Sequence, residues 1–186
     1  MNEISCIYIS RDGTPVSGDL QEFARRSCEE VRFTDMKNRS VPTDTVLPHV
    51  VYQNVADAIG WLTKTFGFTE HYRYGEPGGP ISGAQMHLGD VSIMVRGARA
   101  GSASPAQLGY GTQSLTVFVE DVDAHFQRSK LAGARIVEDL HETVYGERQY
   151  GVEDLDGHRW LFSQRARDVS PEEWGAKIAN LGTGTL

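Results

Sequence analysis

The candidate residues for an acid–base or carbonyl-binding site in this sequence are His49, Tyr150 and Arg159. An imidazole can act as a general base, whereas a phenol or a guanidinium can polarise a carbonyl group. Glu147 is the natural carboxylate to work with them, but its position beside Arg148 is more typical of a surface ion pair. The sequence therefore offers polar groups for catalysis or for ligand binding without one clear acid–base pair.

The strands that would carry these groups have two different faces, because successive side chains of a strand point to opposite sides of its sheet. One face is uniformly apolar and is predicted to form a core beneath amphipathic helices. Its residues are Val50, Tyr52, Ile93, Val95, Val117, Val119, Trp160 and Phe162. The other face mixes polar and apolar side chains, which suits a binding cleft. Its residues are Leu47, His49, Val51, Ser92, Met94, Arg96, Ser114, Thr116, Phe118, Arg159, Leu161 and Ser163.

The direction of Tyr150 depends on the register of its hairpin. A four-residue turn at 154–157 places Tyr150 opposite Leu161 and Arg148 opposite Ser163, so that both point into the cleft. The alternative for Arg148 is an ion pair with a neighbouring glutamate at the surface.

His49 and Arg159 also admit more than one interpretation. His49 is either a cleft residue that hydrogen-bonds ligand or backbone, or a structural histidine. A shift of the register by two would instead make it a metal ligand together with His87. Arg159, opposite Val152, points into the cleft or extends to its rim.

An internal repeat displaced by 67 positions explains how these strands are organised. The matching runs are 50–55 with 117–122 and 89–95 with 156–162. In each copy a strand ends at a helix-capping residue, Asn54 or Asp121, and the following helical segment stops at Gly67 or Gly133. Two further strands fit before the last one, so each copy is predicted to be a βαβββ module.

The predicted fold class is therefore α+β, with two tandem βαβββ modules and an extra N-terminal segment. The predicted parts are an N-terminal extension (1–45), the first module and linker (46–111), the second module (112–164) and a C-terminal helix or tail (165–186). Within the extension we expect a weak strand at 4–9 and a helix at 19–31, which pack on a sheet or mediate self-association.

The motifs at these positions resemble the glyoxalase/bleomycin-resistance family, also called the vicinal oxygen chelate superfamily, in a largely uncharacterised bacterial branch. The motifs that carry the resemblance lie at 54–62, 66–68, 119–126, 145–150 and 154–160, and the similarity covers 46–175. The resemblance implies two curled sheets that form one cleft, used for metal-dependent chemistry or for sequestering small molecules. It also implies a possible homodimer.

The resemblance further implies where a metal would be held. In metal-using members the ligands come from the first and last strand of each module, which are Leu47, Met94, Ser114 and Leu161 in this sequence. None of the four is a histidine or a carboxylate, and a hydroxyl with a thioether is a poor site for zinc, iron, nickel or manganese. We therefore expect no metal and no cofactor.

Our first hypothesis is a metal-independent small-molecule-binding protein that resembles the antibiotic-sequestering members. The alternative is a metal-free isomerase or cyclase of a biosynthetic pathway, with His49 as general base and Arg159 or Tyr150 polarising a carbonyl. Metal-dependent catalysis ranks third. The predicted ligand-binding residues are His49, Met94, Ser114, Thr116, Phe118, Tyr150, Arg159 and Leu161.

Composition excludes several other classes of protein. The formal net charge is −7 with the acidic residues dispersed, which argues against a nucleic-acid partner. No apolar run approaches the roughly 18 residues of a membrane span, and the first residues lack the pattern of a secretory signal. The cysteines, Cys6 and Cys28, fit two reduced thiols in a cytoplasmic protein, with a single disulfide as the alternative.

Overall fold

The computed structural model describes residues 46–179 of the 186-residue chain. The chain divides into two units, 1–43 and 44–186, and everything below concerns the second. The strand and helix expected in the N-terminal extension, and the pairing of Cys6 and Cys28, lie outside the described residues. None of the described helices is long and apolar enough to cross a membrane.

The described chain consists of two βαβββ modules, as the repeat predicts. The first contains β1 (His49–Tyr52), α2 (Val55–Phe66), β2 (Thr69–Gly75), β3 (Ile81–Leu88) and β4 (Val91–Gly97). The second contains β5 (Ser114–Phe118), α4 (Val122–Leu131), β6 (Arg135–Glu142), β7 (Glu147–Glu153) and β8 (Arg159–Arg165). A short helix, α3 (Pro105–Leu108), lies in the linker, and a 3₁₀ turn, η2 (Pro171–Trp174), follows β8.

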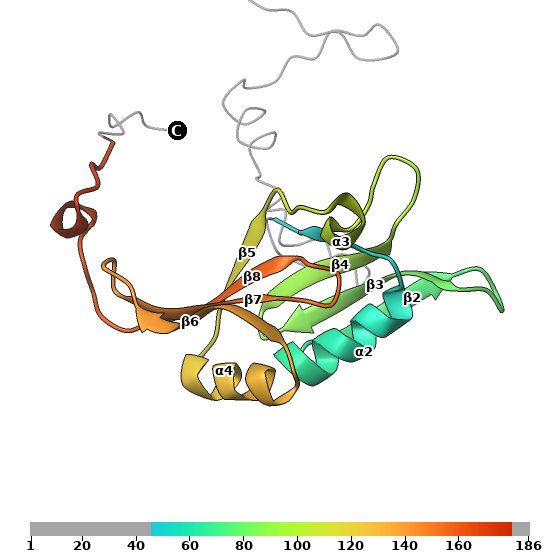
Figure 1. Cartoon of the computed structure of the whole chain (residues 1–186), viewed down its shortest axis with the longest axis horizontal. Helices are drawn as coiled ribbons and strands as arrows, with labels where there is room; N and C mark the ends of the chain where they lie inside the picture. The colour runs from blue at the N-terminus through green and yellow to red at the C-terminus, as the bar shows by residue number, and fades with distance from the viewer. Residues whose placement is uncertain (1–45, 180–186) are drawn as a thin grey trace, which may run out of the picture. The chain divides into compact units, whose positions relative to one another are not determined.

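Each module forms its own four-stranded sheet with the same strand order. The orders are β1-β4-β3-β2 and β5-β8-β7-β6, and the sheets do not close into a barrel. The first and last strands of each module run parallel, with His49 beside Met94 and Ser114 beside Arg159. Figure 1 shows helices α2 and α4 lying next to each other.

The predicted signals for helix ends are confirmed in both modules. The side chain of Asn54 accepts hydrogen bonds from the backbone N–H groups of Ala56 and Asp57, and Asp121 accepts one from Ala124. Gly67 ends α2 in the left-handed conformation, with φ 87°. A side chain at Gly67 would also meet the Arg128 guanidinium at 2.7 Å, so both backbone and packing favour glycine here.

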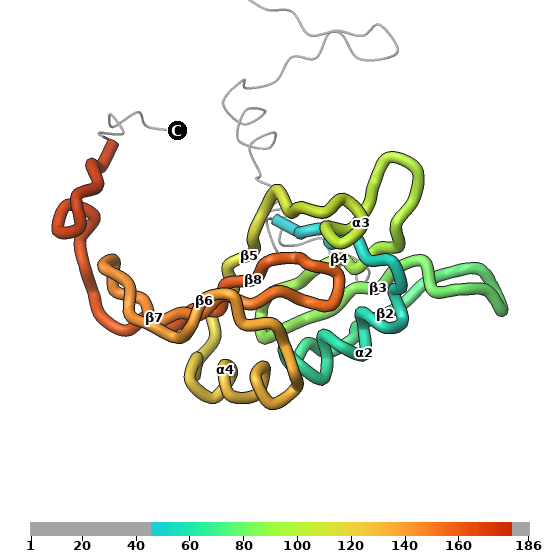
Figure 2. Tube along the Cα trace, viewed as in Figure 1, coloured from blue at the N-terminus to red at the C-terminus, as the bar shows by residue number. Residues whose placement is uncertain are grey.

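One core joins the two modules on the helix side of the sheets. The ring of Phe66 in α2 lies 4.7 Å from Phe162 and 5.6 Å from Trp160, centroid to centroid, both in β8. From α4, Arg128 donates hydrogen bonds to the carbonyl groups of Thr63 and Lys64, which are the unpaired acceptors at the end of α2. Figure 2 shows the linker returning past β1 before it enters β5. The modules therefore fold against each other rather than as separate units.

Candidate functional site

The apolar face predicted for the strands is confirmed by burial, whereas the mixed face also contains buried residues, namely Ser92, Met94 and Ser163. Val50, Tyr52, Trp160 and Phe162 are at most 1% exposed and lie against the helices. The opposite side of each sheet carries the mixed set of side chains. We call these two surfaces the open face of the first sheet (β1–β4) and the open face of the second sheet (β5–β8).

The turn between β7 and β8 differs from the predicted one. It spans five residues, 154–158, because the backbone N–H of Asp154 donates to the carbonyl of His158. The Asp154 carboxylate also accepts the backbone N–H groups of Asp156 and His158, at 3.0 and 2.9 Å. This extra residue shifts the hairpin register by one position. The predicted register is therefore wrong.

Tyr150 consequently faces the core and not the predicted cleft. It pairs with Phe162, whereas Gly151 pairs with Leu161, and its side chain is fully buried. Its hydroxyl lies 2.7 Å from Nδ1 of His125 and 2.8 Å from Oγ of Ser129. Burial raises the pKa of the Tyr150 phenol above its ordinary value. Because the phenol joins β7 to α4, it is not available to a ligand on the open face.

The open face of the second sheet holds Arg159 in an ion pair. Arg159 lies opposite Glu153 and not Val152, and its guanidinium lies 3.3 Å from the Glu138 carboxylate. Its charge is thus already balanced by a carboxylate of β6, which is separated from β8 by β7. Ser114, Thr116 and Phe118 are exposed on the same face, whereas Leu161 is half-buried.

Arg148 and Glu147 also have partners of their own. Arg148 forms a two-pronged ion pair with Asp123 of α4, both distances being 2.8 Å. Arg148 therefore forms an ion pair at the surface, as the alternative predicts, but its partner is Asp123 and not a neighbouring glutamate. Glu147 accepts a hydrogen bond from Oγ of Ser163 at 2.6 Å. Neither residue is free to serve as an acid or base.

The open face of the first sheet is arranged differently. His49 is exposed, and its Nδ1 lies 3.2 Å from Nη1 of Arg96, which can only donate. Met94, beside His49 in the parallel register, is 9% exposed. On the other side of Met94 lies Gln85, whose amide oxygen is 2.8 Å from Nδ1 of His71. The side chains of β1, β4 and β3 therefore form a row in which polar groups lie on both sides of the Met94 thioether, and we call it the polar row.

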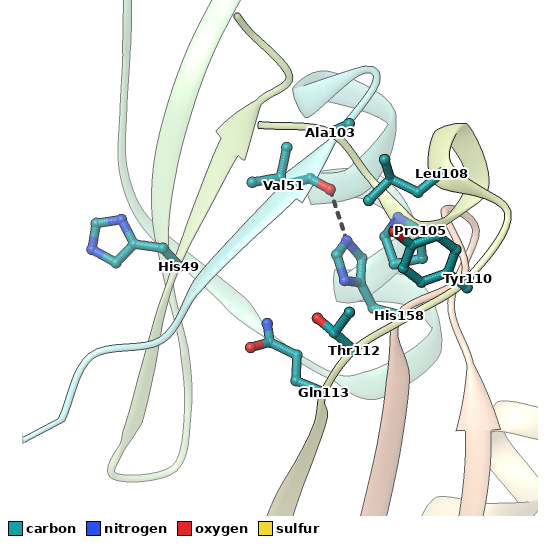
Figure 3. A pocket seen from close by; sticks show the side chains of 10 residues that line it. His49, Val51, Ala103, Pro105, Leu108, Tyr110, Thr112, Gln113 and His158 are labelled. Atoms are coloured by element: carbon teal, nitrogen blue, oxygen red, sulfur yellow. Dashed lines mark hydrogen bonds between the residues drawn. The ribbon is translucent and has the colours of Figure 1, made fainter. Parts of the chain in front are cut away.

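A pocket of about 100 Å³ opens beside β1, where the linker passes the turn before β8. His158 lines it, and its Nε2–H donates to the carbonyl of Val51 at 2.7 Å. In Figure 3 the side chains of His158, Pro105 and Tyr110 gather on one side of β1, whereas the His49 ring lies apart from them. This pocket does not bring His49 together with Thr116 or Arg159.

The predicted site residues therefore fall into separate groups. Within 46–179, no hydrogen bond or ion pair joins a predicted site residue of the first sheet to one of the second. In the same part of the chain, no three histidine, cysteine, aspartate or glutamate side chains gather as a metal site.

Comparison with known proteins identifies the family. Residues 44–162 match the model of the glyoxalase/bleomycin resistance protein/dioxygenase superfamily. The chain belongs to this superfamily. An uncharacterized protein of Mycobacterium bovis is 32% identical over 142 residues, which is 74% of this chain and 93% of that protein. A Mycobacterium tuberculosis relative shows the same identity over 84% of its own length.

Two solved structures share the fold. TioX from Micromonospora sp. ML1 is 36% identical and has a TM-score of 0.56, covering 66% of this chain and 98% of TioX. The fosfomycin resistance protein FosX from Listeria monocytogenes is 13% identical, with a TM-score of 0.50, covering 72% of this chain and 98% of FosX. At 13% identity, the similarity to FosX supports the fold of this chain and not its function.

Sequence reasoning missed the importance of Gln85 and Arg96. The alternation of strand residues does place Arg96 on the mixed face. Arg159 differs from it by having an ion-pair partner, Glu138, and that partner is on another strand whose position the sequence does not show. Gln85 could be found only from the register of β3 against β4, which the sequence leaves open.

Proposed function

We propose that this superfamily member is a metal-independent small-molecule-binding protein whose ligand lies on the open face of the first sheet. The observation that carries the choice of binding over catalysis is the bond between Arg96 and His49. Because the guanidinium can only donate, Nδ1 of His49 is the acceptor in this bond and the ring hydrogen lies on Nε2. The accessible nitrogen of His49 is then a hydrogen-bond donor, and a general base needs a free lone pair.

Names within the family support a small molecule as the partner. The superfamily description includes bleomycin resistance proteins, and the FosX structure is titled a fosfomycin resistance protein. Both names refer to resistance against small organic compounds. For this chain they support a sequestering role, which the polar row of the first sheet would serve.

Metal independence follows from the residues at the four positions that hold metal in other members. We predict that the purified protein contains no stoichiometric divalent metal and that a chelator leaves its melting temperature unchanged. Elemental analysis and a thermal melt test this directly. One tightly held zinc, nickel, manganese or iron ion per chain would contradict the proposal.

A ligand screen separates binding from catalysis. Small molecules that co-purify with the protein are identified by mass spectrometry and then titrated by calorimetry. We expect His49→Ala and Arg96→Gln to weaken ligand affinity by roughly 10-fold or more, with no product formed by the wild type. If the wild type instead converts the ligand and His49→Ala lowers turnover by about 100-fold while affinity is kept, the protein is an enzyme.

We also propose that a homodimer encloses the ligand. Small-molecule sites bury most of the surface of their ligand, whereas His49, Thr116 and Phe118 are exposed in the single chain. A second copy placed over these faces would supply the missing cover. Light scattering on the purified protein should give twice the chain mass, and a monomer that binds ligand tightly would remove this part of the proposal.

A further inference from the structure

Arg96 is a half-buried cation for which the described part of the chain supplies no carboxylate partner. Its described side-chain hydrogen bond goes to Nδ1 of His49, and no ion pair to it occurs among residues 46–179. Arg159 and Arg148, in contrast, are balanced by Glu138 and Asp123. The remaining N–H groups of Arg96 can therefore donate to an anionic partner from outside the chain.

Gln85 provides a second unused donor on the same face. The side chain is 1% exposed, and its amide oxygen is held by His71. Among residues 46–179 its Nε2 group has no hydrogen-bond partner, which is rare for a buried amide in a folded protein. The group is closed to solvent, so a ligand reaches it by displacing the side chains that cover it. Pairing this group with an acceptor on a ligand would recover a hydrogen bond that the chain alone leaves unmade.

The strand register places these two donors at a defined spacing. Gln85 lies directly across from Met94, and Arg96 follows Met94 by two residues on the same face. Diagonal neighbours of this kind lie roughly 7–8 Å apart. The ring of Tyr74 lies over Gly83, directly across from Arg96, where any side chain on the glycine would collide with the phenol. An aromatic ring and a thioether therefore lie beside the two donors.

We propose that the open face of the first sheet binds an aromatic carboxylate that also carries a carbonyl group, an inference that rests on the proposed small-molecule function. The carboxylate accepts from Arg96, and the carbonyl accepts from Nε2 of Gln85. The flat ring of the ligand packs between them, beside Tyr74 and Tyr72, whose hydroxyl contacts Sδ of Met94 at 3.9 Å. With a net charge of −7, the rest of the chain repels anions, so binding depends on these local contacts.

The probe that matches this spacing is para-acetylbenzoate, in which a benzene ring separates the carboxylate from the ketone. Its neutral counterpart is para-acetylbenzamide, and benzoate lacks the ketone. In calorimetric titrations we expect the wild type to bind para-acetylbenzoate roughly 10-fold or more tightly than the amide. It should also bind para-acetylbenzoate several-fold more tightly than benzoate, because benzoate lacks the ketone that accepts the hydrogen bond from Gln85.

Three variants assign these preferences to residues. Arg96→Gln should remove the preference for the carboxylate, and Arg96→Lys should keep part of it because the charge remains. Gln85→Leu should reduce the affinity for para-acetylbenzoate to that for benzoate. The matched control is Arg148→Gln, because Arg148 is paired with Asp123 of α4 and should leave all three affinities unchanged. Circular dichroism establishes that each variant is folded.

Failure of this inference can be told apart from failure of the proposed function. If para-acetylbenzoate does not bind, or if Arg96→Gln and Arg96→Lys leave the carboxylate preference intact, the inference is overturned. The binding function still stands if a neutral compound binds and shifts the backbone amide resonances of β1 and β4. If no compound of a broad library shifts those resonances, both proposals fail.

Discussion

Adjacent side chains in β8 have opposite roles, although both are large and apolar. Trp160 is fully buried, packs against Phe66 and Phe68, and donates its indole N–H to Asp154 at 3.0 Å. Leu161 points to the open face of the second sheet and is half-buried. The sequence alone predicts this difference correctly, because alternation along β8 fixes the face of each of its residues even though the predicted register against β7 is wrong.

Trp160→Ala should therefore lower the free energy of unfolding by about 3–5 kcal/mol, since it removes a large buried side chain. Leu161→Ala should cost less, about 1–2 kcal/mol, because part of that side chain is already in water. Urea unfolding followed by circular dichroism measures both. Equal losses for the two variants would contradict the assignment of the faces.

The turn 154–158 shows how one carboxylate can set the register of two strands. Oδ1 of Asp154 accepts the two backbone N–H groups within the turn, and Oδ2 accepts the hydroxyl of Tyr52 at 2.7 Å as well as the Trp160 indole. Burial, and then the Asp154 charge, raise the pKa of the Tyr52 phenol. The sequence indicated a turn here, but its length depends on this long-range bond between modules. For that reason the side-chain directions of β7 could not be predicted.

Replacing Asp154 with alanine should destabilise the protein by roughly 2–4 kcal/mol, because several buried donors lose their acceptor together. The control is Leu155→Ala, in the same turn, whose side chain is 39% exposed and should change stability little. Guanidinium unfolding curves provide the comparison. A loss for Asp154→Ala no larger than that for the control would show that the carboxylate does not hold the turn.

Across the whole molecule, His125 links the modules through a neutral imidazole. Its Nε2–H donates to the Phe66 carbonyl at 2.9 Å, and its Nδ1 accepts from the Tyr150 hydroxyl. Burial lowers the pKa of His125, the Phe66 carbonyl opposes this shift, and the charge of Arg128 adds to it. The repeat predicted both modules, but not this contact, because the side chains that join two copies are not themselves repeated. The cytoplasmic location and the absence of nucleic-acid partners stay predictions.

Stability should therefore decrease as the pH falls below about 6.5, the ordinary histidine value. Between that value and the lowered pKa, the unfolded chain binds a proton at His125 that the folded chain does not, so lower pH favours unfolding. Urea unfolding at pH 7.5, 6.5 and 5.5 tests this, and His125→Gln should reduce the dependence on pH. His141→Gln removes a more exposed histidine and should keep it. An unchanged slope in His125→Gln would contradict this role.

The shared core also has a consequence for the order in which a growing chain can fold. The strands β1 to β4 are complete when the ribosome has made residue 97, but their helix-side partners, Trp160 and Phe162, come much later. Tyr52 and Asp154, which bond across the modules, are 102 positions apart. During synthesis the first module therefore presents Phe66 and Phe68 to water, or to a chaperone, until β8 emerges.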